Sequence, residues 1–128
     1  VPDPVKRARQ RDVIENGMTS SYLPDAARRF RKLYDDMEER LASNTWLVGD
    51  DLSLADIAMM PYVTRFDHLQ LLDILTNRPG LSAWYDRMKS RPGVEVGIGE
   101  WLNDKYLTLM REKGLESQTA FMSLFHND

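Results

Sequence analysis

The chain of 128 residues is 42% hydrophobic and 29% charged, which is the composition of one globular domain rather than of a disordered segment. Its net charge of −3 gives no electrostatic footprint for nucleic acid as a partner, and no apolar run is long enough to cross a membrane. The absence of cysteine excludes disulfides, thiolate metal sites and a cysteine nucleophile, and two histidines alone cannot form a multi-histidine metal site.

The N-terminal residues Val1 to Pro4 have the composition of a linker remnant, and the chain does not begin with Met. We therefore expect the sequence to be part of a longer polypeptide. Apolar spacing predicts a first helix from about Pro4 to Asn16, with Gly17 as the residue that ends it. A polar break of a few residues follows.

The second predicted helix begins near Pro24, which suits the first turn of a helix because its missing N–H is not needed there. The helix has one apolar and one charged face, and the acidic run over residues 35–39 is interpreted as a solvated surface rather than a metal site. The apolar stripe comprises Ala26, Phe30, Leu33, Met37 and Leu41.

The strongest helix-start signal is a capping box formed by Ser53 and Asp56. Ser53 at the N-cap can accept a hydrogen bond from the backbone N–H of Asp56, and the carboxylate of Asp56 can reach back to the N–H of Ser53. Leu52 can pack on Ile57 as a hydrophobic staple. This role explains Asp56 fully, so we interpret it as structural rather than catalytic. The apolar loop before it, residues 44–51, is expected to pack on the core.

This third helix is predicted to run through Pro61, which should kink it, towards Leu72. One stripe of the helix is apolar apart from an arginine, and that arginine needs a partner or a wet pocket. The stripe comprises Leu54, Ile57, Ala58, Pro61, Arg65, Leu69 and Leu72.

The C-terminal third is predicted to contain a helix over residues 81–90, a weak helical turn over 92–98 and a helix over 100–113 that stops at Gly114. The expected inward residues are Leu81, Trp84, Tyr85 and Met88 in the first of these helices, and Leu102, Tyr106, Leu109 and Met110 in the last. Residues 115–128 then form a C-terminal extension. Because no segment alternates as a half-buried strand would, the fold class is all-α, with a single helical domain over residues 1–128.

No self-sufficient catalytic motif is present, so candidates for function are binding residues. Tyr22 and Tyr62 combine an apolar ring with a polar tip, and Arg65 interrupts an apolar stripe, although buried structural roles are an equal alternative. Phe121 and Phe125 in the tail could cap a hydrophobic ligand cleft, or they could anchor packing within or between molecules.

The order of these signals resembles the C-terminal domain of the glutathione S-transferase family over about residues 2–96. The specific feature is the combined order of motifs, each of which is weak alone. They are Trp46-Leu47-Val48-Gly49-Asp50, then Leu52-Ser53-Leu54-Ala55-Asp56-Ile57 with Pro61 and Arg65 downstream, Arg78-Pro79 with Leu81, Trp84 and Met88, Arg91-Pro92-Gly93-Val94, and, upstream, Pro2-Asp3-Pro4 with Arg7-Ala8.

The resemblance implies a helical bundle that supplies the hydrophobic-substrate half of an active site and holds no catalytic residue or cofactor of its own. An N-terminal thioredoxin-like domain would bind glutathione, the co-substrate, and favour its thiolate, which attacks an electrophilic small molecule. The complete protein would be a cytoplasmic homodimer. The substrate-binding residues implied for this chain are Ile14, Met18, Tyr22, Tyr62, Arg65, Phe121 and Phe125.

One departure concerns the two N-terminal helices, which are shorter over Arg7–Leu41 than the family's usual long pair. Either the pair is truncated or residues are absent between about Gly17 and Pro24. Two other functions compete with transferase activity. One is a non-catalytic helical interaction domain in a protein complex, and the other is a glutathione-dependent lyase or etherase.

Overall fold

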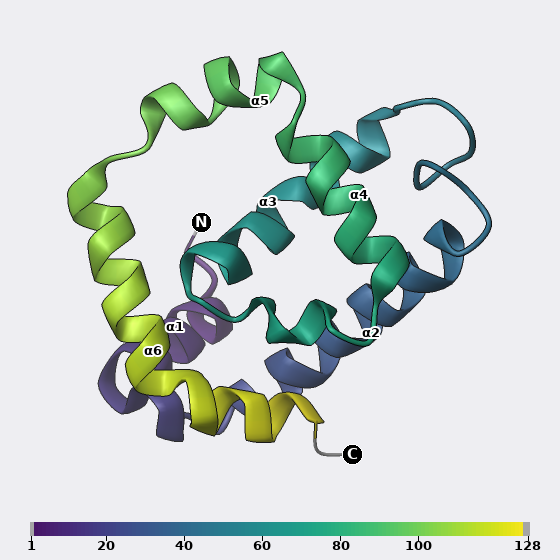
Figure 1. Ribbon diagram of the computed structural model, residues 1–128. Helices are drawn as coiled ribbons and strands as arrows, with labels where there is room; N and C mark the ends of the chain where they lie inside the picture. Colours follow the sequence, from purple (N-terminus) through teal and green to yellow (C-terminus); the bar gives the residue numbers. More distant parts are fainter. Residues whose placement is uncertain (1, 127–128) are drawn as a thin grey trace.

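The computed structural model describes residues 2–126, and in this part of the chain all regular structure is helical (Figure 1). The predicted all-α class is therefore confirmed. The helices are α1 (Pro4–Asn16), α2 (Leu23–Leu41), α3 (Leu54–His68), α4 (Pro79–Lys89), α5 (Pro92–Gly97) and α6 (Asp104–His126), with 3₁₀ turns at Gly17–Thr19, Leu72–Leu75 and Gly99–Trp101.

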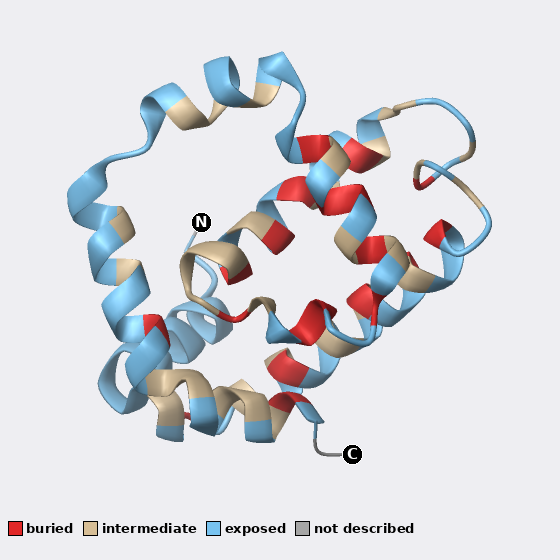
Figure 2. Ribbon diagram, in the orientation of Figure 1, coloured by how far each residue is buried: buried red, intermediate tan, exposed pale blue. Residues whose placement is uncertain are grey.

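The centre of the fold is made by α2, α3 and α4, with the C-terminal part of α6 closing one side (Figure 1). Helix α2 packs against α4 and α6, and α3 packs against the same two helices. The buried residues gather where these elements meet, whereas α1, α5 and the first half of α6 are almost entirely exposed (Figure 2). The largest fully buried side chains are Trp84, Tyr34, Phe125, Ile74 and Leu81.

The capping box of α3 is confirmed, and it belongs to a larger buried arrangement. The N–H of Ser53 donates to Asp56 Oδ2 over 2.9 Å, and Ser53 Oγ accepts from the N–H of Ala55 over 3.2 Å. The second carboxylate oxygen, Asp56 Oδ1, accepts from the N–H of Leu47 at 3.0 Å and from the indole N–H of Trp84 at 2.8 Å. One side chain thus ties the 44–51 loop, the start of α3 and the middle of α4 together.

Hydrogen bonding keeps Asp56 ionised although it is fully buried. Burial alone raises the pKa of a carboxyl, but the hydrogen bonds from Leu47, Ser53 and Trp84 outweigh it, so the pKa of Asp56 is held below its usual range. The charge is stabilised by donors rather than by a cation.

The acidic run of α2 lies on a solvated face at Asp35, Asp36 and Glu39, which are exposed, but the prediction is wrong for Glu38, which is half-buried. Glu38 caps the start of α4, because its two carboxylate oxygens accept from the N–H groups of Gly80 at 3.0 Å and Leu81 at 2.7 Å. Asp35 pairs with the buried Arg78 over 2.7 Å. Spacing along α2 could not reveal these partners, since both lie more than 40 positions away along the chain.

The apolar stripe singled out on α3 is not the face that packs on the core. Leu54 is 82% exposed and Ile57 is 54% exposed, whereas Met60, Val63 and Phe66 are buried. Helix α3 is apolar around most of its circumference, so periodicity could not choose the buried side. A helix that is hydrophobic all round is normally covered on both faces.

The prediction that the last helix stops at Gly114 is wrong, because α6 continues to His126. Gly114 is buried inside α6 and lies directly against the backbone of Leu69: a Cβ at this position would be 1.8 Å from the Leu69 carbonyl oxygen. Glycine is needed here because α6 lies close to the backbone of Leu69, and not because a helix ends at this position.

The inward residues predicted for a helix over 100–113 are also wrong for three of four positions, and Leu102 lies before α6 begins. Leu102, Tyr106 and Leu109 are exposed, and only Met110 is half-buried. The four residues predicted inward in α4 are all buried, which confirms that prediction.

Helix α1 has the predicted bounds, and Gly17 after it adopts φ +52°, as a glycine that ends a helix commonly does. Asp3 caps its start by accepting from the N–H groups of Val5 and Lys6. No residue of α1 is buried. A 13-residue helix of this kind has little stability of its own, because isolated helices of about 12–15 residues are marginal in water.

The first prediction concerns Asp56. Substitution Asp56→Asn removes acceptance from the Ser53 N–H and should lower the free energy of unfolding at pH 7 by about 2–3 kcal/mol. Because the pKa of Asp56 is lower in the folded state, its carboxylate stabilises the fold fully at a pH above the unfolded-state pKa of about 4. This stabilisation is lost as the pH falls from there through the folded-state pKa. Urea denaturation at pH 7 and pH 3.5 measures both effects.

The matched control is Asp51→Asn, an exposed aspartate in the neighbouring loop. It should change the free energy of unfolding by less than about 0.5 kcal/mol. Equal effects of the two substitutions at pH 7 would contradict the role assigned to the buried carboxylate.

The second prediction compares two glycines. Gly114→Ala places a methyl group into the Leu69 backbone and should destabilise the fold by about 1–3 kcal/mol or more. Gly97→Ala in α5 meets nothing within 4 Å and should be neutral or slightly stabilising, since alanine favours helix. Thermal unfolding followed by circular dichroism measures both, and similar melting temperatures for the two variants would disprove the close contact.

Candidate functional site

A surface groove lies between α1 and the start of α2, and two of the sequence-predicted binding residues, Ile14 and Tyr22, line it. Its volume is about 720 Å³, a size suited to a small organic molecule. Ile14 is 83% exposed, so its side chain is available to a ligand. The complete lining is Arg9, Gln10, Val13, Ile14, Tyr22, Leu23, Asp25, Ala26 and Arg29.

The turn that joins α1 to α2 is fixed by hydrogen bonds. The carboxylate of Asp12 accepts from Asn16 Nδ2 at 2.8 Å and from the hydroxyl of the buried Ser20, which fixes the turn against α1. The N–H of Tyr22 donates to Ser20 Oγ over 3.3 Å. Met18 lies half-buried in this turn and is not among the groove-lining residues.

The charged residues of the groove come from both helices. Arg29 Nε lies 3.1 Å from Asp25 Oδ2, and Arg28 Nη2 lies 3.4 Å from Asp25 Oδ1, so one carboxylate serves two guanidinium groups. Arg9 lies on the opposite wall. Sequence reasoning missed the two lining arginines; the available signal was that Arg9, Gln10, Val13 and Ile14 share one face of α1 at helical spacing.

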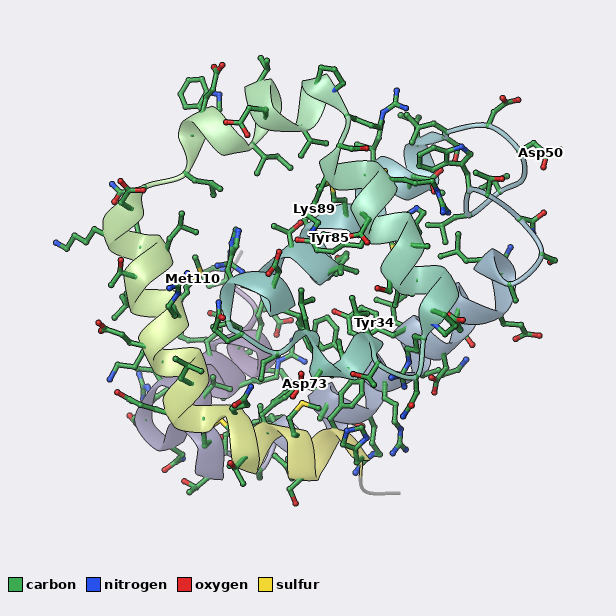
Figure 3. The ribbon with its side chains drawn as sticks, viewed as in Figure 1. Tyr34, Asp50, Asp73, Tyr85, Lys89 and Met110 are labelled. Carbon is green, nitrogen blue, oxygen red and sulfur yellow. The ribbon has the colours of Figure 1, made fainter. Side chains whose placement is uncertain are left out.

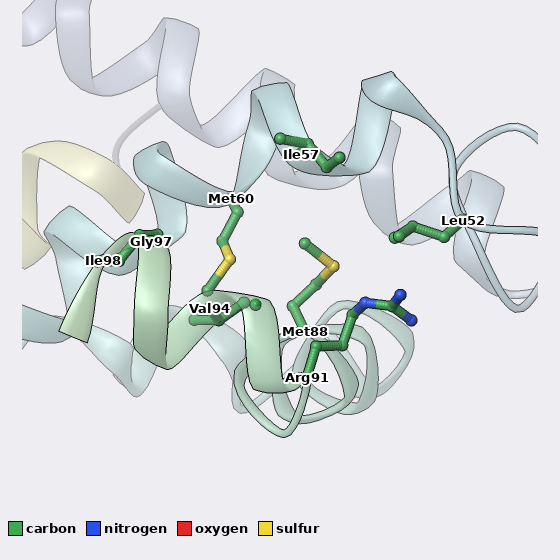
Figure 4. A pocket seen from close by; sticks show the side chains of 9 residues that line it. Leu52, Ile57, Met60, Met88, Arg91, Val94, Gly97 and Ile98 are labelled. Carbon is green, nitrogen blue, oxygen red and sulfur yellow. The ribbon is translucent and has the colours of Figure 1, made fainter. Parts of the chain in front are cut away.

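A second hollow of about 430 Å³ lies between α3 and α5, and its wall is largely apolar (Figure 4). The side chains of Met60 and Met88 point into it from the core side, and Arg91 stands at one end (Figure 4). Leu52 and Ile57, predicted to form a hydrophobic staple, both line it. Together with the exposed Leu54, these residues give α3 an apolar outer face.

Tyr62 and Arg65 lie on α3 and line neither hollow. Tyr62 is 46% exposed, and its ring contacts that of Phe30 with centroids 6.1 Å apart. Arg65 is exposed, and its Nη1 lies 2.6 Å from the sulfur of Met110 on α6. The arginine in the apolar stripe therefore links α3 to α6 at the surface.

Phe121 and Phe125 lie in an aromatic cluster where α6 meets α2 and α3. Phe125 is fully buried, with its ring centroid 6.4 Å from Tyr34 and 6.5 Å from Phe66. The guanidinium of Arg78 stacks over its ring at 5.4 Å. Phe121 is half-buried and contacts Phe66 edge-on. The structure thus gives Phe125 the packing role, and the binding roles of all seven predicted residues stay predictions.

Two buried tyrosines near the centre are not acid–base groups at neutral pH (Figure 3). Burial raises the pKa of Tyr34, whose hydroxyl donates to the carbonyl of Tyr62 over 3.0 Å. Burial also raises the pKa of Tyr85, and its hydrogen bond to Asp67 Oδ2 at 2.7 Å raises it further. Both hydroxyls therefore stay protonated and act as hydrogen-bond donors.

Within residues 2–126, no group of three or more histidine, aspartate or glutamate side chains is arranged to hold a metal ion. In the same part of the chain, no helix has both the length and the hydrophobicity needed to cross a membrane.

In the residues described, the fold is thus a helical domain with two apolar hollows at its surface and an N-capped central helix. Comparison with known families shows to which class it belongs. The profile of the family "Glutathione S-transferase, C-terminal domain" matches residues 7–87, and the chain is a member of that family. The resemblance seen in the sequence is confirmed.

Several curated proteins are similar to this chain. Glutathione S-transferase TCHQD of Arabidopsis thaliana is 32% identical over 98 residues, which are 69% of this chain and 36% of that protein. Disulfide-bond oxidoreductase YfcG of Escherichia coli is 35% identical over 74 residues, 55% of this chain and 34% of that protein. Tetrachloro-p-hydroquinone reductive dehalogenase of Sphingobium chlorophenolicum is 32% identical over 66 residues, 52% of this chain and 27% of that protein.

The chain thus spans about a third of the length of the curated relatives that it matches. No solved structure matches it significantly.

The third prediction compares the loss of a buried aromatic side chain with the loss of an exposed one. Phe125→Ala should lower the free energy of unfolding by about 3–5 kcal/mol, because it empties the centre of the aromatic cluster. Trp101→Ala removes a larger side chain that is 82% exposed, and should cost less than about 0.5 kcal/mol. Urea denaturation of both variants tests this, and a small effect of Phe125→Ala would show that the C-terminal end of α6 is not part of the core.

Proposed function

We propose that this chain is the hydrophobic-substrate-binding domain of a glutathione transferase, and that the complete protein transfers glutathione to an electrophilic small molecule. Family membership supports glutathione as the co-substrate. The observation that carries the substrate-binding role is the α1–α2 groove, which unites Ile14 and Tyr22 in one apolar hollow of suitable size.

We propose that the outer face of α3 receives the N-terminal thioredoxin-like domain. Leu54 and Ile57 are large, exposed and adjacent to the α3–α5 hollow. Exposed apolar surface of this kind marks an interaction site, and a helix that is apolar on both faces is typically covered on both. The curated relatives are about three times as long as their matched regions, which leaves room for such a domain.

In this proposal the two domains have different roles. This chain supplies apolar surface and shape, and the thioredoxin-like domain supplies the glutathione site and the group that favours the thiolate. The thiolate sulfur attacks the electrophilic carbon, a carbon–sulfur bond forms, and the leaving group departs with the bonding electrons. We further propose a cytoplasmic homodimer, as the family resemblance implies. Two explanations for the short N-terminal helices stay open: truncation of the pair, or absence of residues between about Gly17 and Pro24. The assignment of residues 1–4 as a linker remnant and of 115–128 as a C-terminal extension also stays a prediction.

A second candidate is glutathione-dependent reduction or lyase chemistry. The names of two relatives, a reductive dehalogenase and a disulfide-bond oxidoreductase, favour it. The two activities differ in product: a transferase leaves glutathione joined to the substrate, whereas a reductive enzyme consumes a second thiol and releases oxidised glutathione. Product analysis by mass spectrometry distinguishes them.

The fourth prediction tests the function with a chimera. The part of the Arabidopsis relative that precedes the region matched by this chain is joined to residue 1, and conjugation of glutathione to 1-chloro-2,4-dinitrobenzene is followed by absorbance. The chimera should conjugate and the 128-residue chain alone should not. A chimera that is folded in both parts but inert would favour the non-catalytic interaction domain.

In the same chimera, Ile57→Glu should separate the two domains, because it would bury a carboxylate without a partner in the interface. Conjugation should fall by about tenfold or more, and the linker should become sensitive to protease. The control is Val48→Glu, since Val48 is 70% exposed but lies in the loop before α3. Equal effects of both substitutions would contradict the proposed docking face.

A further inference from the structure

The peptide bond between Asn16 and Gly17 lies where α1 ends and the turn to α2 begins. Both residues are exposed, and a Cβ on Gly17 would meet nothing within 4 Å. Of the five asparagines of the chain, Asn16 is the one that precedes a glycine. The backbone nitrogen of Gly17 is therefore not shielded by a side chain of its own, and its attack on the Asn16 side-chain amide would close a five-membered ring.

In the folded turn, hydrogen bonds hold both reacting groups. The N–H of Gly17 donates to the carbonyl of Val13, and Asn16 Nδ2 donates to Asp12 Oδ1 over 2.8 Å. The hydroxyl of Thr19 donates to the carbonyl of Asn16 over 2.8 Å. While these bonds persist, the Gly17 nitrogen and the Asn16 amide are each directed at a different partner, so the ring does not close.

Helix α1 frays easily, because little besides this turn secures it. None of its residues is buried, and a helix of 13 residues is marginal by itself. Helix ends fray with a free energy close to zero, and the last turn of α1 contains the Asn16 amide. Fraying of that turn releases the Gly17 nitrogen and the Asn16 side chain together.

We infer that Asn16-Gly17 is a site of spontaneous deamidation, and that the carboxylate formed there loosens the turn that positions α1. In the frayed turn the Gly17 nitrogen gives its proton to hydroxide and attacks Asn16 Cγ. A bond forms between this nitrogen and Cγ, the bond from Cγ to Nδ2 breaks, and Nδ2 takes up a proton from water and leaves as ammonia.

The cyclic imide that remains is opened by water, which adds to one of its two carbonyl carbons. Opening at Cγ gives aspartate with the original main chain. Opening at the other carbonyl gives isoaspartate, whose main chain runs through the former side chain and is longer by one carbon. Both products carry a carboxylate at position 16, and neither step needs a cofactor or a second protein.

The new carboxylate would be unfavourable at this place in the fold. Asp12, which accepts from the Asn16 amide, would face a second negative charge one turn away, and like charges at this spacing destabilise a helix. A negative charge at a helix C-terminus also opposes the helix dipole. Asp12 further accepts from the hydroxyl of Ser20, so the repulsion acts on a bond that fixes the turn. Since α1 lines one side of the α1–α2 groove, loss of its last turn alters that groove whatever the groove binds.

The test follows the 128-residue chain during incubation at pH 7 and at pH 8.5. Mass spectrometry of the tryptic peptide 12–28 measures conversion of Asn16, which adds about 1 Da. The internal control is Asn103 in peptide 90–105, since this asparagine is also exposed but precedes an aspartate. Asn16 should convert about tenfold faster than Asn103 or more, because Gly17 has no side chain to obstruct the ring. The rate should rise with pH, because the attacking nitrogen must lose its proton.

Three variants separate the reaction from its surroundings. Asp12→Ala removes the acceptor of the Asn16 amide and should speed conversion by about threefold or more, as the loss of one hydrogen bond implies. Glu15→Ala removes an exposed acidic residue of the same helix and should change the rate by less than about twofold. Asn16→Gln keeps an amide but requires a six-membered ring, so conversion at this position should be far slower.

The structural effect is measured by NMR of the ¹³C- and ¹⁵N-labelled chain, in which Cα chemical shifts report helix content. The helical shifts of residues 12–16 should weaken in the converted chain and in Asn16→Asp. They should persist in Asn103→Asp, which places the same new charge outside α1, and in Asn16→Gln after the same incubation.

Equal rates at Asn16 and Asn103 would overturn the assignment of the site. Conversion in urea but not in the folded chain would show that the turn stays closed, and this also overturns the inference. Conversion that leaves the helical shifts of α1 unchanged would disprove the loosening of the turn. The inference does not depend on the proposed function, which the chimera tests separately.

Discussion

The carboxylate of Asp56 accepts hydrogen bonds from Leu47, Ser53 and Trp84, and the arrangement of the central helices depends on it. These donors come from a loop, a helix N-terminus and the middle of another helix. A buried charge is costly unless donors surround it, and here the donors are three N–H groups and the hydroxyl of Ser53, all of them neutral. The position of α3 relative to α4 is therefore set by a polar contact, around which the apolar core packs.

The same principle operates at the start of α4, where Glu38 of α2 accepts from two free N–H groups. Both contacts join helix starts to distant segments, since helix N-termini carry unsatisfied donors. The C-terminal end of α6 is secured differently, through the burial of Phe125 beneath Arg78 and the close approach at Gly114. The helices that form the centre are thus fixed at defined points, and the exposed α1 is tied to its following turn by the hydrogen bond from Ser20 to Asp12.

The two apolar surfaces differ in a way that bears on function. The outer face of α3 is broad and aliphatic, as expected for contact with another protein domain. The α1–α2 groove is a hollow of about 720 Å³ with Arg9 and Arg29 among its lining residues, a size suited to a small molecule. A domain partner and a substrate can therefore occupy this chain at separate places. In the function that we propose, the partner domain would bring glutathione and the groove would hold the molecule that glutathione attacks.

The all-α class, the bounds of α1, the capping box and the buried side of α4 could all be predicted from the sequence, because each depends on local spacing or local hydrogen bonding. The sequence also singled out Ile14 and Tyr22, which the structure brings into one groove, but not Arg9 and Arg29, which line the same groove. The buried face of α3 could not be predicted, because both faces are apolar, and the need for glycine at position 114 could not be predicted, because Leu69 lies far away in sequence. A contact between residues that are far apart in the sequence produces no periodic pattern, so its partners can be identified only from the packed helices.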